Sequence, residues 1–123
     1  ENFESILKRK KEIDALYRKE LEGVGDIKFQ KNDPNSEPNC WLFTFRTKKM
    51  RNLLEYLNKN EIQSRPFWTP MNNLPMYRDL NYISENDISN QIFSECISIP
   101  SSSNLTLEDQ NTVITEIKKF YKL

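Results

Sequence analysis

Apolar residues recur at helical spacing over two separate parts of the chain. Residues 4–22 place their apolar positions on one face of a helix, and residues 48–61 do the same. Gly23 and Gly25 follow the first pattern directly and are expected to end that helix. The expected apolar face of the first helix comprises Phe3, Ile6, Leu7, Ile13, Leu16, Tyr17 and Leu21.

Shorter segments alternate apolar and polar residues as half-buried strands do. Residues 26–31 form one such segment, and residues 40–47 form another through Trp41, Phe43 and Phe45. The intervening residues are rich in Asn, Asp, Ser and Pro, which predicts a loop. The short connection between the two segments favours an antiparallel pair.

Proline controls the conformation of the middle of the chain. Residues 62–68 are expected to be extended because Pro66 lacks an amide proton and disfavours helical geometry at Arg65. A proline in a strand predicts a strand end or a sheet edge. Residues 69–80 are expected to be irregular, and residues 96–100 read as another short strand.

Two further helices are predicted in the last third of the chain. Ser84 and Asp87 are typical of a helix start, as are Thr106 and Asp109, and residues 101–104 between these helices read as a linker. The expected buried face of the earlier helix comprises Ile88, Ile92, Phe93 and Cys96. That of the last helix comprises Val113, Ile114, Ile117 and Phe120.

The order of these elements predicts an α+β fold. We expect a small, mostly antiparallel sheet of three to four strands with helices packed on one face. A length of 123 residues predicts a single domain over residues 1–123. The opening Glu1 and the immediate helical pattern suggest a piece of a longer protein.

The amino-acid composition limits the kinds of catalytic and metal-binding site that this sequence can form. Histidine is absent, which excludes catalysis by a histidine base and histidine-ligated zinc. Cys40 and Cys96 are expected to be reduced, buried thiols, and no cluster of metal ligands is visible. No apolar run is long enough to span a membrane and no signal peptide is recognisable, so a cytoplasmic protein without membrane contact is expected.

The charge pattern does not favour nucleic acid. Lysines and arginines equal the acidic residues in number, so the formal net charge is zero. Residues 8–11 form a basic run, which could bind nucleic acid or serve as a nuclear localisation signal. A solvated helix face is the simpler interpretation of that run.

Residues 61–80 combine a cation with aromatic and amide side chains. Arg65 could bind a phosphate or carboxylate through two parallel hydrogen bonds. Aromatic faces suit sugars and bases. The accompanying side chains are Phe67, Trp68, Asn72, Asn73 and Tyr77. From the residues alone, a packed loop that covers the sheet edge explains the segment slightly better than a ligand site does.

Three motifs in order resemble the C-terminal part of the DegT/DnrJ/EryC/StrS family. They are "NCWLFTFRT", "IQSRPFWTPMNNLPMYRDL" and "SECISIPSSSNLTLEDQNTVITEIKKFY". Members of that family are fold-type I, pyridoxal phosphate-dependent aminotransferases that act on nucleotide-linked keto-sugars. The middle motif is most similar to the branch that makes amino sugars for bacterial surface glycans. The resemblance implies the small domain of such an enzyme, which forms a homodimer.

The resemblance also implies roles for individual residues. Arg65 would contact the diphosphate or the sugar, while Trp68 and Tyr77 would form walls of the substrate site. Asn72 stands where many relatives have histidine, which leaves its sugar contact open. The Schiff-base lysine and most cofactor contacts belong to a large domain that is not in this chain. We therefore expect no catalytic residue, no bound pyridoxal phosphate and no activity from this chain alone.

A second hypothesis belongs to a different class. The chain could be a stand-alone binding or interaction module that shares the fold without the enzyme. The coding sequence upstream of Glu1 distinguishes the two, because only an enzyme would continue into a large domain with a Schiff-base lysine.

Overall fold

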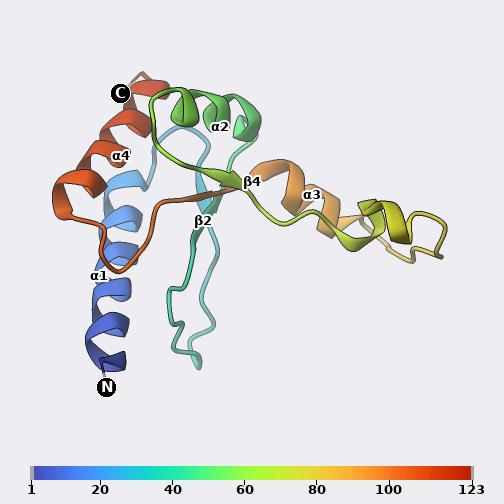
Figure 1. The fold of residues 1–123 in the computed structure, drawn as a ribbon, viewed down its shortest axis with the longest axis horizontal. Coiled ribbons are helices and arrows are strands. Elements are labelled where there is room, and N and C mark those ends of the chain that lie inside the picture. Colours follow the sequence, from blue (N-terminus) through green and yellow to red (C-terminus); the bar gives the residue numbers. More distant parts are fainter. Residues whose placement is uncertain (1, 123) are drawn as a thin grey trace.

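Four helices, four short strands and two 3-10 turns make up the fold of the described residues (Figure 1). The computed structural model describes residues 2–122. In chain order the elements are α1 (Phe3–Leu21), β1 (Lys28–Phe29), β2 (Phe43–Arg46), α2 (Met50–Lys59), β3 (Arg65–Pro66), η1 (Met71–Asn73), η2 (Pro75–Tyr77), α3 (Ile88–Glu95), β4 (Cys96–Ile99) and α4 (Leu107–Phe120).

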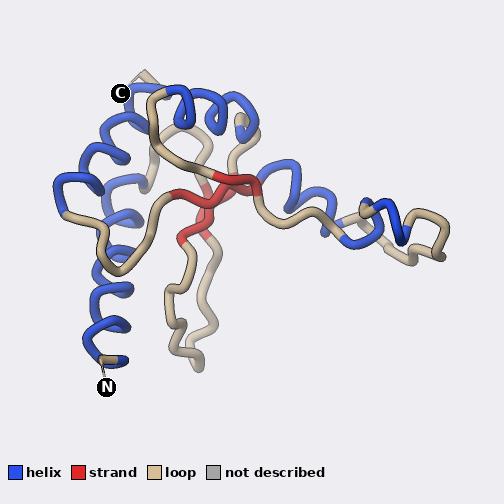
Figure 2. The backbone as a smooth tube through the Cα atoms, in the orientation of Figure 1, coloured by secondary structure: helices blue, strands red, loops and turns tan. Residues whose placement is uncertain are grey.

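The strands form one antiparallel sheet in the order β1-β2-β4-β3 (Figure 2). Phe45 lies opposite Ile97 between the two central strands, and Arg65 lies opposite Ser98 at the β3 edge. The proline-containing strand is therefore an edge strand, as its missing amide proton predicts. The predicted α+β architecture with a small antiparallel sheet is confirmed.

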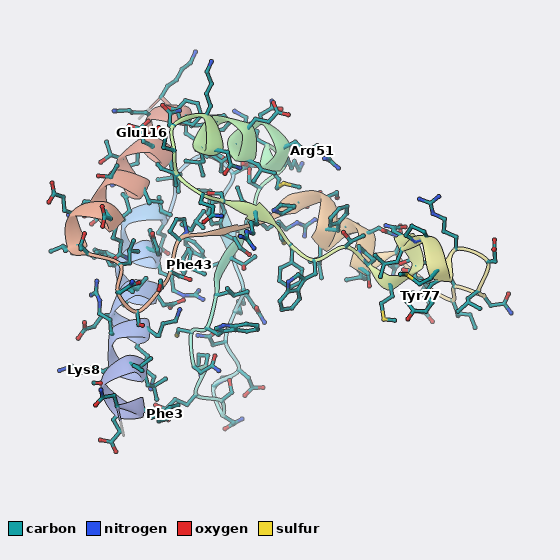
Figure 3. The ribbon with its side chains drawn as sticks, in the orientation of Figure 1. Phe3, Lys8, Phe43, Arg51, Tyr77 and Glu116 are labelled. Atoms are coloured by element: carbon teal, nitrogen blue, oxygen red, sulfur yellow. The ribbon has the colours of Figure 1, made fainter. Side chains whose placement is uncertain are left out.

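Alternation along β2 and β4 separates a buried face of the sheet from an open one. Phe43, Phe45, Ile97 and Ile99 are buried beneath α1, α2 and α4, while the residues between them are partly or fully exposed. The ring of Tyr17 lies 4.8 Å from that of Phe43, and Figure 3 shows Phe43 on the side of β2 that faces α1. The rest of the core consists of Ile13, Leu21, Val24, Met50, Leu53, Leu57, Ile62, Val113, Ile114 and Ile117.

The long β1–β2 connection departs from the prediction. The strand expected from Cys40 begins only at Phe43, and Trp41 is 62% exposed instead of alternating into the core. Cys40 has a φ of 52°, which no regular strand contains. Residues 30–42, which we call the hairpin loop, instead run beside the first half of α1, where Lys10 donates to the carbonyl oxygen of Trp41 (Figure 1).

The predicted burial of two α1 residues and of the two cysteines is also wrong. Phe3 and Ile6 on α1 are exposed because this half of the helix extends beyond the sheet (Figure 1). Cys40 and Cys96 are free thiols but only partly buried.

Residues 67–95, which we call the arm, project away from the sheet (Figure 1). The expected burial of the α3 face is wrong, because Ile88 is 54% and Ile92 is 39% exposed and no residue of α3 is fully buried. α3 contacts α2 near the sheet, and the arm extends outward from there, away from α1 and α4 (Figure 1). Its two halves are joined by a hydrogen bond between the side chains of Asn73 and Asn90.

The segment between β4 and α4 is pinned to α1, although the sequence predicts a linker there. The hydroxyl of Tyr17 donates to the carbonyl oxygen of Pro100 at 2.8 Å, and Arg9 donates to that of Leu105 at 2.7 Å. Thr106 then caps α4, as predicted, because its side chain accepts from the amide of Asp109 at 3.0 Å. These contacts fix the position of residues 100–105 against α1.

Candidate functional site

Arg65 lies on the open face of the sheet. It sits on edge strand β3 opposite Ser98, whose hydroxyl is 2.8 Å from that of Thr44 on β2. Strand neighbours in register point to the same face, so these three side chains share one surface. The side chain of Arg65 is exposed and makes no hydrogen bond or salt bridge with another residue in the described range 2–122.

A groove of about 580 Å³ opens beside Arg65. It lies between the first half of α1, the end of the hairpin loop, the β3 edge and the segment that follows β4. Its lining includes Phe3, Ile6, Leu7, Lys10, Asn39, Trp41, Leu42, Gln63, Arg65, Ser98 and residues 99–103. The sequence places these residues far apart. The pairing of β3 with β4 and the contacts of α1 with the two loops bring them together.

The charge of the groove is positive. Lys10 and Arg65 both line it, and none of the described lining residues is acidic. The ammonium of Lys10 donates to the carbonyl oxygens of Trp41 and Ser101, so it holds the hairpin loop and the loop after β4 together. Partial burial lowers the pKa of Lys10 from its usual range. This arrangement suits an anionic ligand.

One aromatic ring lines the groove, and two more pack beside it in series. Trp41 lines it, and its ring lies 5.9 Å from that of Trp68 at the base of the arm. Trp68 packs in turn on Phe67, with ring centroids 5.0 Å apart. Both tryptophans remain 62% exposed. Flat, accessible rings beside a cation can contact a sugar or a base.

The sequence-predicted residues divide into two groups. Arg65 lines the groove and Trp68 adjoins it through Trp41, whereas Asn72 and Tyr77 lie on the arm and do not line it. Figure 3 shows Tyr77 toward the far part of the arm. Both arm residues are half-buried, and the roles predicted for all four remain predictions.

Sequence reasoning missed Lys10, Trp41 and Gln63 as residues of this groove. Lys10 belongs to a basic run that reads as a solvated helix face, and Trp41 fits a strand pattern. Gln63 gives no chemical signal on its own. No local pattern could reveal the groove, since the two acceptors of Lys10 lie 31 and 91 residues away in sequence.

The groove carries cationic groups that can bind an anion. Its described lining offers one amine, one guanidinium and no carboxylate. Within residues 2–122, no group of three or more Asp, Glu or Cys side chains is placed to hold a metal ion. None of the helices in that range is both long and apolar enough to cross a membrane.

Comparison with known proteins adds sequence and structural relatives. GDP-perosamine synthase of Vibrio cholerae is 28% identical over 126 residues, which cover 98% of this chain and 34% of that protein. The structure of S. venezuelae DesV in complex with a ketimine intermediate matches with a TM-score of 0.87 at 21% identity, over 98% of this chain and 33% of DesV. The sugar aminotransferase CalS13 from Micromonospora echinospora matches with a TM-score of 0.83 at 19% identity, over 94% of this chain and 31% of CalS13.

The structural matches establish the fold, and a family model establishes the family. The chain spans about a third of the length of each relative, and the structural likeness at this identity concerns the fold alone. The family model that matches residues 1–118 covers nearly the whole chain. This chain therefore belongs to the DegT/DnrJ/EryC1/StrS aminotransferase family.

Proposed function

We propose that this chain forms the C-terminal small domain of a pyridoxal phosphate-dependent aminotransferase. The complete enzyme would transfer an amino group to a nucleotide-linked keto-sugar that is used for a bacterial surface polysaccharide. Family membership over residues 1–118 carries this proposal. The similarity to GDP-perosamine synthase, whose name contains both a nucleotide and a sugar, supports the substrate class.

The geometry of the groove supports a substrate-facing role. Arg65 is exposed and forms no salt bridge among the described residues, and it shares the groove lining with Trp41, whose ring lies 5.9 Å from that of Trp68. In the proposal Arg65 binds the diphosphate or the sugar, and Trp68 forms a wall beside it. Asn72 and Tyr77 would contact the sugar from the arm, which projects from the domain and can reach another part of the enzyme (Figure 1).

The residues of the groove do not fit pyridoxal phosphate as a resident cofactor. Its lysine, Lys10, has its amine engaged by two backbone carbonyl oxygens. An acidic partner for the pyridine nitrogen is also required, and none of the described lining residues supplies one. We therefore propose that another part of the complete enzyme holds the cofactor and that this chain alone is inactive.

The proposal also includes a homodimeric assembly of the enzyme and its location in the cytoplasm. The exposed apolar side chains of the arm, among them Ile83 and Ile88, support a contact with a further protein surface in a homodimer. We place the enzyme in the cytoplasm, with a nucleotide sugar as its partner and no role in nucleic-acid binding. The zero net charge supports the last point.

Two measurements test the proposal. The protein encoded by the complete reading frame should convert a nucleoside-diphosphate keto-sugar to the amino sugar, detected by mass spectrometry with a panel of amino donors. The 123-residue chain, mixed with pyridoxal phosphate and treated with borohydride, should form no lysine adduct. A reading frame that starts close to Glu1, with tight ligand binding and no amino sugar formed, would establish the stand-alone binding module instead.

A further inference from the structure

We propose that Trp41 stacks on the base of the substrate's nucleotide while Arg65 binds its diphosphate, so that the groove is the nucleotide subsite. This inference rests on the proposed function for the identity of its ligand. It assigns a role to Trp41, a residue whose sequence pattern predicts only a buried strand position.

Trp41 is held as a stacking platform. Its indole is 62% exposed and lines the groove, and the Trp68 ring lies 5.9 Å away at an interplanar angle of 45°. Its backbone is fixed as well, because the ammonium of Lys10 donates to its carbonyl oxygen at 2.5 Å. A side chain with its backbone anchored and its ring packed on a neighbour loses less conformational freedom when a base stacks on it.

The charges of the groove complement a diphosphate. Arg65 forms no salt bridge within residues 2–122, so its guanidinium can offer two parallel N–H donors to phosphate oxygens. Lys10 adds a second positive charge, and two of its three N–H groups are already engaged. No acidic side chain among the described lining residues would repel the ligand.

The dimensions of the groove agree with this ligand class. A volume of about 580 Å³ lies in the middle of the range for small-molecule sites, about 300 to 1,000 Å³. A base on Trp41 and a diphosphate on Arg65 would leave the sugar to extend toward another part of the enzyme. Single-stranded nucleic acid uses the same stacking and charge, but zero net charge disfavours that ligand.

The test measures binding to the complete protein that contains this chain. UDP, GDP, inorganic pyrophosphate and a single-stranded oligonucleotide are titrated by calorimetry into the wild type and into Trp41→Ala, Trp41→Phe and Arg65→Ala. The matched control is Arg51→Ala, which removes an exposed arginine on α2 that does not line the groove (Figure 3). Circular dichroism verifies that each variant is folded.

The expected results distinguish the base contact at Trp41 from the diphosphate contact at Arg65. Trp41→Ala should weaken UDP and GDP about tenfold and leave pyrophosphate unchanged, and Trp41→Phe should retain most of the affinity. Arg65→Ala should weaken all three ligands by about tenfold, and Arg51→Ala should change none.

Three results would overturn the inference. These are equal affinity for nucleoside diphosphates and pyrophosphate, a Trp41→Ala variant that binds UDP and GDP like the wild type, and an oligonucleotide that binds more tightly than either nucleotide. Amino-sugar formation by the complete protein tests the proposed function separately. If the complete protein makes the amino sugar but Trp41 does not affect nucleotide binding, only the present inference fails.

Discussion

Replacement of Gly25 by alanine should destabilise the fold far more than the same replacement of Gly23. Both glycines follow α1 and have positive φ angles, 56° and 76° respectively. A Cβ atom on Gly25 would lie 2.1 Å from Cδ1 of the Tyr121 ring, whereas one on Gly23 would meet no atom within 4 Å. The pair therefore separates backbone strain from steric conflict.

The Tyr121 ring cannot move aside without losing hydrogen bonds. Its hydroxyl is 2.6 Å from the hydroxyl of Thr47 and donates to Asp26 Oδ1 at 3.1 Å. The positive φ costs about 1 kcal/mol at either glycine. Displacement of the ring adds about 1 kcal/mol for each lost hydrogen bond, so Gly25→Ala should cost about 2 kcal/mol more than Gly23→Ala. That difference corresponds to roughly 8 °C in melting temperature for a domain of this size.

Urea unfolding followed by circular dichroism measures the two costs directly. Free energies of unfolding that agree within about 0.5 kcal/mol for the two variants would refute the argument. Tyr121→Ala provides an internal test, because it removes the ring that the new Cβ would meet. Once Gly25→Ala is present, the additional cost of Tyr121→Ala should be smaller than in the wild type.

Three further predictions concern pH, capping and association. Burial raises the pKa of Tyr121 to about 12, above the value of about 10 in an unfolded chain. Its stabilising contribution should therefore be complete below pH 10 and be lost as the pH rises through 12, a decline in urea-unfolding free energy that Tyr121→Phe should reduce. Thr106→Ala should lower the unfolding free energy by about 1 kcal/mol through loss of the α4 cap, whereas Thr112→Ala on the same helix should cost clearly less; equal costs would contradict the capping role. Ile92→Glu on the exposed face of α3 should reduce self-association in analytical ultracentrifugation, and Ser94→Glu should not; equal effects would show that charge alone is responsible.

Periodicity was sufficient to predict the part of the fold in which local pattern and burial agree. Phe43 and Phe45 alternate into the core beneath the sheet. Pro66 lies on an edge strand because it has no amide proton to donate to a second neighbouring strand. Thr106 begins α4 because its hydroxyl accepts from a free amide at the helix start. In each case the deciding interaction lies within a few residues or a single strand.

Contacts between residues far apart in the sequence determine the features that the local pattern did not predict. The apolar positions of α3 repeat as a buried face would, yet Ile88 is exposed because the arm carries the helix away from the sheet. Trp41 follows the strand alternation, but the left-handed conformation of Cys40 precedes it in the hairpin loop. The link from Lys10 to Ser101 spans 91 residues, so the groove has no local sequence signal.

The most direct test of a substrate-facing domain is the steady-state kinetics of the complete protein with Arg65→Ala. The account predicts that the KM for the sugar nucleotide rises at least about tenfold while the KM for the amino donor stays unchanged, because only the sugar nucleotide carries a diphosphate. Arg51→Ala should leave both values at those of the wild type. A sugar-nucleotide KM that is unchanged by Arg65→Ala, or an equal rise for both substrates, would contradict the assignment of this domain to the sugar nucleotide.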